Sequence, residues 1–140
     1  MKMVMKMKQT KCYTYFRITG NFDPDAVTEM LGLQPEKSWK IGDKRSNGSE
    51  YTFATWNFGY CEEYDSIVDE QMRKTLAPLL PKTAVLQEIK QKFDVNLYLE
   101  IVPTLVLDEE MPCLAPSLDV MQFCCDTQTE LDIDLSIESY

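Results

Sequence analysis

The sequence predicts an α+β fold: a ferredoxin-like βαββαβ core with an added C-terminal helix and strand, and a largely antiparallel sheet. Three observations support this prediction. The chain has 140 residues, 44% of them hydrophobic, which suits one domain with a substantial core. Segments with strand-like alternation recur, and helix-like segments separate them. Because no repeat or linker interrupts the sequence, we expect a single domain over residues 1–140, with residues 1–10 as a frayed N-terminal end.

The first two elements are a strand over residues 11–19 and a helix over residues 24–31. The strand sequence, KCYTYFRIT, places its phenylalanine and isoleucine on one face and its two tyrosines and arginine on the other. The helix has Asp23 as its N-cap and Pro24 at its first position, where the missing N–H costs nothing. Gly32 can adopt the left-handed conformation that ends a helix.

A hairpin with a long loop is expected next. SWKI, residues 38–41, is a short strand, and EYTFATWNF, residues 50–58, is a longer one rich in aromatic and β-branched residues. The segment between them, GDKRSNGS, contains the glycine, asparagine and serine that favour turns.

Two helical segments follow the hairpin. The first is expected to begin near Asp65, because Ser66 and Asp69 have capping-box spacing, and Pro78 disrupts its end. The second spans about residues 82–93, with apolar residues on one face.

The last three elements are a strand over residues 94–102, a helix from Ser117 to about Thr127, and a strand over residues 130–137. In the final strand, ELDIDLSI, apolar and mostly acidic residues alternate. The residues expected to face the core are Leu131, Ile133, Leu135 and Ile137.

Charge is distributed unevenly along the chain, whose net charge is -9. Residues 1–45 have a balance of +4, and residues 46–140 a balance of -13, with no basic residue after Lys92. Most of such a surface would repel DNA or RNA, so we expect no nucleic-acid partner. A basic protein partner would be attracted instead.

Histidine is absent, and this excludes Ser-His and Cys-His catalytic pairs and mixed Cys/His zinc sites. The five cysteines form an odd set without a CxxC motif, which favours a reducing cytoplasm over a secreted disulfide framework. The N-terminal lysines are not followed by the apolar region of a signal peptide, and no apolar run approaches the ~20 residues of a membrane span. We therefore expect no export and no membrane partner.

One long stretch carries a set of motifs: YFRITGNFDPDAVTEMLGLQPEKSWKIGDKR. It contains a strand, an aspartate-proline-acid helix start, a T-x-x-LG helix end, a proline, and a polar turn with GD. A tryptophan-bearing strand, TWNF, follows, and the chain ends in the acidic alternating strand LDIDLSI. This set, over about residues 12–138, resembles the bacterial domain-of-unknown-function family 4279. The resemblance implies a small bacterial α+β domain, with no catalytic residue and no cofactor.

The first candidate site is the basic loop within this stretch. Ammonium and guanidinium groups can bind a phosphate or carboxylate, and glycine lets backbone N–H groups approach it. The P-loop pattern is absent, and the alternative is a solvated hairpin loop with its tryptophan folded on the core. The residues of this anion- or partner-binding loop are Lys37, Trp39, Lys40, Gly42, Lys44 and Arg45.

Sheet aromatics form the second candidate. They could stack nucleobases, but the charge balance and the missing RNP-type motif favour a core or protein-contact role. They are Tyr13, Tyr15, Tyr51, Trp56, Phe58 and Tyr60.

Taken together, these features favour a small cytoplasmic, non-enzymatic binding or interaction module. One version of this hypothesis is a homodimer that associates through an exposed sheet face. The alternative is an immunity- or inhibitor-type protein that neutralises a basic toxin or enzyme through its acidic surface. A hydrolase or transferase that uses the basic loop for an anionic substrate is a third class. The identity of any partner is left open.

Overall fold

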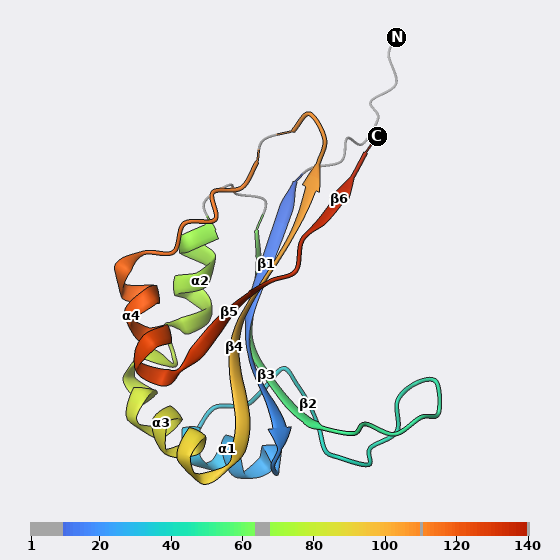
Figure 1. Ribbon diagram of the computed structural model, residues 1–140, viewed down its shortest axis with the longest axis vertical. Coiled ribbons are helices and arrows are strands. Elements are labelled where there is room, and N and C mark those ends of the chain that lie inside the picture. The colour runs from blue at the N-terminus through green and yellow to red at the C-terminus, as the bar shows by residue number, and fades with distance from the viewer. Residues whose placement is uncertain (1–9, 64–67, 110, 140) are drawn as a thin grey trace.

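The computed structural model describes residues 10–63, 68–109 and 111–139 (Figure 1). The prediction of a frayed end therefore falls almost wholly outside the described residues, and so does the predicted helix start at Asp65 and Ser66. The elements in chain order are β1 (Lys11–Asn21), α1 (Pro24–Leu31), β2 (Lys37–Trp39), β3 (Ala54–Glu63), α2 (Val68–Leu76), the short 3₁₀ helix η1 (Leu80–Lys82), α3 (Thr83–Lys92), β4 (Asp94–Val106), α4 (Leu118–Thr127), β5 (Thr129–Ile133) and β6 (Ser136–Glu138).

The strands form a mostly antiparallel sheet in the order β2-β3-β1-β4-β5, which confirms the predicted α+β class. β1 is antiparallel to both β3 and β4, and β2 is antiparallel to β3. β5 and then β6 run parallel to β4, so together they form one interrupted edge strand.

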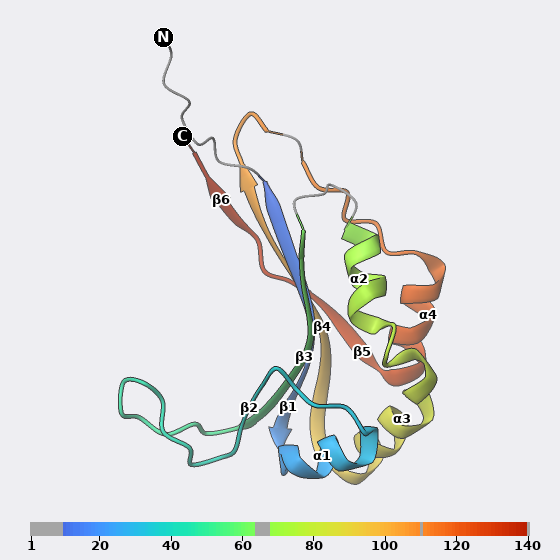
Figure 2. The same cartoon turned by 180° about the vertical axis from the view of Figure 1, so that it is seen from behind.

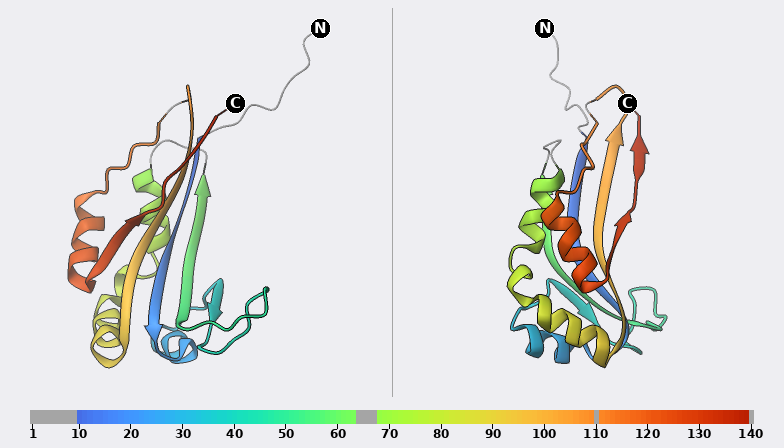
Figure 3. Two further views of the ribbon diagram at one scale, coloured as in Figure 1. Left: turned by 45° about the vertical axis from the view of Figure 1, so that its right-hand side comes forward. Right: turned by 60° about the vertical axis from the view of Figure 1, so that its left-hand side comes forward.

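The helices cover one face of this sheet, and the other face is uncovered (Figures 2 and 3). Alternation in β1 and β4 decides which side chains are covered, because successive residues of a strand point to opposite faces. Even positions of β1 from Cys12 to Ile18 and odd positions of β4 from Val95 to Ile101 are buried against the helices. We call the uncovered side the open face; it carries the odd positions of β1, including Tyr13, Tyr15 and Arg17.

The start of the fold follows its predicted local signals. The Asp23 side chain accepts a hydrogen bond from the Asp25 N–H at 3.0 Å, and Gly32 ends α1 with φ 68°. Val27 and Leu31 are fully buried, so α1 packs on the core through the face that carries them.

The second strand of the hairpin begins later than predicted, at Ala54 rather than residue 50, and it continues to Glu63. Its pairing with β1 starts where Gly20 lies opposite Ala54, so earlier residues have no β1 partner. Instead, the Tyr51 N–H donates to the Asp43 carbonyl at 2.9 Å. Residues 40–53 thus form an arm that projects from the body of the molecule (Figure 1).

The predicted burial of the last strand is wrong. Its apolar side chains are partly exposed because β5 and β6 lie at the sheet edge, while α4 packs on the core through Val120 and Phe123. The four side chains that were predicted to face the core have exposed fractions of 40% for Leu131, 49% for Ile133, 49% for Leu135 and 62% for Ile137.

Candidate functional site

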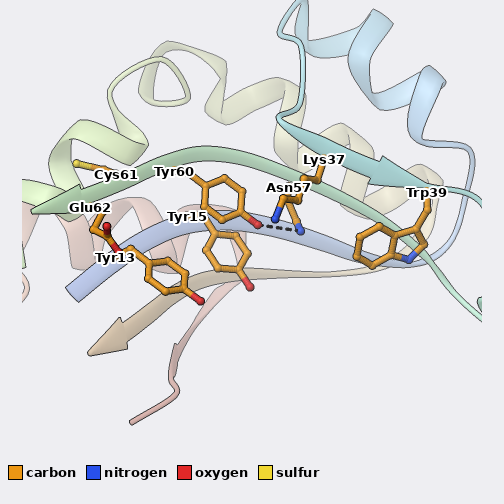
Figure 4. A pocket seen from close by; sticks show the side chains of 8 residues that line it. All are labelled: Tyr13, Tyr15, Lys37, Trp39, Asn57, Tyr60, Cys61 and Glu62. Atoms are coloured by element: carbon orange, nitrogen blue, oxygen red, sulfur yellow. Dashed lines mark hydrogen bonds between the residues drawn. The ribbon is translucent and has the colours of Figure 1, made fainter. Parts of the chain in front are cut away.

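A groove of about 650 Å³ runs along the open face over β1, β2 and β3 (Figure 4). Aromatic side chains dominate its lining, and polar groups lie between them. We call it the tyrosine groove. It is lined by Tyr13, Tyr15, Lys37, Trp39, Asn57, Tyr60, Cys61 and Glu62.

Three tyrosine rings stack along this groove. The Tyr15 and Tyr60 rings have centroids 4.4 Å apart, and Tyr13 lies 6.0 Å from Tyr15 and 6.3 Å from Tyr60. Offset stacking at such separations is favourable and holds the rings in fixed positions. The stack therefore offers a largely preformed aromatic surface.

A β-bulge brings Tyr60 onto the open face. The register shifts from Thr14 opposite Cys61 to Phe16 opposite Phe58, so β3 has one extra residue there. Gly59 lies in the bulge with φ 80°, and a Cβ at this position would lie 2.9 Å from the Thr75 carbonyl oxygen. Glycine is therefore required both by the backbone conformation and by the close approach of α2.

Unpaired polar atoms face the same side of the sheet. Asn57 is only 5% exposed; its Nδ2 donates to the Tyr60 hydroxyl at 3.3 Å, but its Oδ1 has no hydrogen-bond partner among the described residues. The same holds for the Trp39 Nε1 donor, the Arg17 Nε donor and the Thr55 hydroxyl. Buried polar groups are usually paired, so this concentration of unpaired atoms points to a binding surface.

Burial raises the pKa of Tyr15 to about 12, with the nearby Glu100 carboxylate as the second cause. Burial also raises the pKa of Tyr60. Both hydroxyls are therefore protonated at neutral pH, and both can donate a hydrogen bond.

A second hollow of about 330 Å³ lies on the open face beside β5. We call it the acidic hollow. It is lined by Arg17, Thr19, Phe53, Tyr98, Glu100, Glu130, Leu131 and Asp132. Glu100 is only 3% exposed, and its carboxylate lies 3.7 Å from the Arg17 guanidinium. Burial, followed by the hydrogen bond and negative charge of Asp132, raises the pKa of Glu100 to about 8 despite the Arg17 charge.

The predicted basic loop is divided between two places. Lys37 and Trp39 line the groove, where the Lys37 ammonium lies 5.4 Å from the centroid of the Tyr60 ring. Trp39 also stacks on Tyr51, with centroids 4.4 Å apart, at the base of the projecting arm.

The other basic residues of the loop have partners within the chain. Lys40 lies 2.8 Å from an Asp25 carboxylate oxygen at the start of α1. Lys44 pairs with Glu50 at 3.7 Å, and the Arg45 guanidinium lies 4.4 Å from the centroid of the Tyr51 ring. Gly42, with φ 91°, shapes the turn between them. The structure thus does not bring the six predicted residues into one pocket, and their role as a binding loop stays a prediction.

The sequence analysis missed three polar residues of the open face: Arg17, Asn57 and Glu100. Strand alternation predicts that Arg17 shares a face with the tyrosines, because all occupy odd positions of β1, but it gives Arg17 no role in a site. No sequence signal identifies Glu100, because its burial depends on β5 lying beside β4. The sheet aromatics divide between the two faces: Tyr13, Tyr15 and Tyr60 line the groove, while Trp56 is fully buried in the core.

The described residues include no group of three or more histidine, cysteine or acidic side chains arranged to hold a metal ion. Among the helices of this part of the chain, none has the length and apolar character needed to cross a membrane.

Comparison with known proteins identifies one family model, described as a domain of unknown function (DUF4279), which matches residues 10–138. No curated protein and no solved structure matches the chain.

Proposed function

Because the chain belongs to the DUF4279 family, whose description assigns no activity, we propose a function from its own surfaces. The protein is a small cytoplasmic, non-enzymatic binding module that holds an extended segment of a partner protein in the tyrosine groove. The observation that carries this proposal is the preformed stack of Tyr13, Tyr15 and Tyr60 beside buried polar atoms that have no hydrogen-bond partner among the described residues.

The groove is suited to a proline-rich segment in the polyproline II conformation. Such segments bind aromatic-lined grooves, and their backbone carbonyls have no internal hydrogen bonds. The Nε1 donor of Trp39, a residue of the groove lining, lacks a partner in the described chain, so it is available to a carbonyl group. The stacked rings supply flat apolar surface for proline side chains at little further cost in ordering.

The non-enzymatic and cytoplasmic parts of the proposal rest on composition. The chain contains no histidine, the commonest general acid/base. Cys12, Cys113, Cys124 and Cys125 have no disulfide bond, as expected in a reducing compartment. Burial raises the pKa of the Cys12 and Cys124 thiols to about 11, which disfavours the reactive thiolate.

The test is a titration of the full chain with a blocked oligoproline peptide, monitored by tryptophan fluorescence and backbone amide NMR. We expect saturable binding in the micromolar to millimolar range, with shifts at groove residues. Tyr15→Ala and Trp39→Ala should each weaken binding about tenfold, which corresponds to about 1.4 kcal/mol. Tyr98→Ala is the matched control, because Tyr98 lies on the open face but outside the groove.

Two outcomes would overturn this proposal. One is the absence of saturable binding at about 1 mM peptide. The other is a soluble oligosaccharide that saturates the same tyrosines when the peptide does not, which would assign the aromatic surface to a carbohydrate.

A second candidate function is neutralisation of a basic toxin or enzyme, and the balance of -13 over residues 46–140 favours it. Acidic surfaces accelerate the capture of basic partners. Co-expression with the product of an adjacent toxin-like gene should then protect the host cell. An association rate that does not change with ionic strength would count against this function.

We also propose that the core follows the ferredoxin-like plan. β1 and β2 both run antiparallel to β3, which lies between them, and this supports a split βαβ arrangement. The antiparallel pairing of β1 with β4 is consistent with it, and α4, β5 and β6 are then the C-terminal addition. A solved structure of a relative with a different strand order in this core would contradict it.

A further inference from the structure

The outer edge of β5 has no strand partner among the described residues, since β5 ends the strand order of the sheet. In Figure 3, β5 lies at the margin of the sheet. The Asp134 N–H donates to the Ile101 carbonyl at 2.9 Å. Backbone groups of a strand point alternately to its two sides, so the N–H groups of Ile133 and Leu131 point away from β4. The β5 edge therefore presents unpaired backbone groups.

Side chains of opposite character lie on the two faces of this edge. Leu131 and Ile133 are in register with Leu99 and Ile101, so strand alternation assigns them to the helix-covered side of the sheet, and Leu131 also borders the acidic hollow. They are nevertheless 40% and 49% exposed. A strand paired with β5 would cover these apolar side chains with its own inward-facing residues.

The open-face side of the same edge is acidic. Glu130 and Asp132 are in register with Tyr98 and Glu100, and all four line the acidic hollow. Arg17 is the single basic residue of this lining. A basic side chain from an added strand would enter a space of about 330 Å³ bounded by three carboxyl groups.

We infer that the β5 edge is a strand-addition site for an extended segment of a partner protein that alternates apolar and basic residues. Backbone hydrogen bonds would supply affinity, and the side chains of the two faces would supply specificity. The apolar residues of the segment pack on Leu131 and Ile133, and its basic residues bind the carboxyl groups of the acidic hollow. This site is separate from the tyrosine groove and does not depend on the function proposed for it.

Charge argues against a second copy of the chain as the occupant. Pairing of two β5 edges would bring Glu130 and Asp132 of one copy against those of the other. Like charges opposed across a strand pair are destabilising, and charged edges are a common protection against self-association. The same carboxylates favour a basic segment.

The experiment measures how tightly the protein binds a labelled, end-blocked peptide that alternates lysine and valine. The peptide has roughly seven residues, which is a common strand length. A peptide alternating glutamate and valine, and a non-alternating peptide with the lysine–valine composition, serve as comparators. We expect the lysine–valine peptide to bind at least about tenfold more tightly than either. Binding should also protect the Leu131 and Ile133 amides from hydrogen exchange.

Two variants separate the backbone and charge contributions. Ile133→Pro removes an outward N–H but no donor to β4, so it should weaken binding at least about tenfold while the chain stays folded. Glu130→Gln combined with Asp132→Asn should have a similar effect. Glu88→Gln combined with Asp94→Asn makes the same change in net charge away from the edge, and it should leave the affinity within about twofold.

The inference is overturned if the three peptides bind equally or if none binds at about 1 mM. Because Ile133→Pro could unfold the edge, the charge variants and the exchange data provide independent tests. Unchanged exchange at Leu131 and Ile133 on saturation would exclude strand addition. Self-association through this edge, detected by sedimentation, would assign it to a second copy of the chain instead.

Discussion

Replacing Glu100 with glutamine tests the electrostatics of the acidic hollow. Glu100 is 3% exposed on β4, where it meets Arg17 from β1 and Asp132 from β5. Burial is the main cause that raises its pKa from 4.5 to about 8, and the hydrogen bond and charge of Asp132 follow. Asp134 raises it further. Glutamine has nearly the same shape and an amide that can donate to Asp132, but it never becomes charged.

The magnitude follows from linkage between protonation and folding. Between pH 4.5 and about 8 the folded protein keeps a proton on Glu100 that the unfolded chain releases. The contribution of this group to the free energy of unfolding therefore falls as pH rises through that window. At 1.36 kcal/mol per pH unit, the rise in the pKa of Glu100 from 4.5 to about 8 corresponds to on the order of 5 kcal/mol of unfolding free energy. Relaxation of the structure around the charged Glu100 and Arg17 side chains reduces this value. We expect Glu100→Gln to be more stable than the wild type by on the order of 2–5 kcal/mol at pH 8.5, with the difference vanishing near pH 4.

Urea denaturation of both proteins at several pH values between about 4 and 8.5 measures this difference directly. Comparison at each pH cancels the titration of the other groups. Glu88→Gln, which removes a carboxyl group at an exposed position on α3 outside the acidic hollow, is the matched control. Stability curves for Glu100→Gln and wild type that run parallel over this pH range would contradict a raised pKa for Glu100.

Two glycines and a buried tryptophan test how close backbone contacts and core packing stabilise the fold. Gly20→Ala would place a Cβ 2.1 Å from the Asp94 carbonyl oxygen at a residue with φ 150°, so we expect at least about 2 kcal/mol of destabilisation in urea. Gly48→Ala, at φ 87° with nothing within 4 Å of the added Cβ, should cost only about 1 kcal/mol, and equal losses would contradict the steric explanation. Trp56→Phe removes the Nε1 donor to the Thr28 hydroxyl at 2.9 Å and leaves a core void, so thermal denaturation should detect a loss of about 2–3 kcal/mol. A loss below about 0.5 kcal/mol would show that the core repacks around phenylalanine.

Much of the tyrosine groove could be predicted from strand alternation. The odd positions of β1 carry Tyr13, Tyr15 and Arg17, and period-two alternation puts them on one face in any sheet that contains this strand. The contribution of Tyr60 could not be predicted, because it depends on the bulge at Gly59 and on the approach of Thr75 from α2. The partners of Lys40 and Lys44 depend likewise on how the arm folds back.

The local elements of the fold follow from short-range signals in the sequence. The Asp23 cap and the Gly32 end of α1, the Ser117 cap of α4 and the alternation of β1 and β4 all act between residues close in the chain, so their geometry follows from local chemistry.

The burial of the last strand, in contrast, depends on its place in the sheet. Leu131 and Ile133 have the alternation of a buried strand, yet they are partly exposed, because β5 pairs beyond β4 at the sheet edge. Alternation establishes which residues share a face, but only the position of a strand within the sheet decides whether that face is covered. The same placement buries Glu100 beside Asp132, and so it creates the acidic hollow and the unpaired edge together.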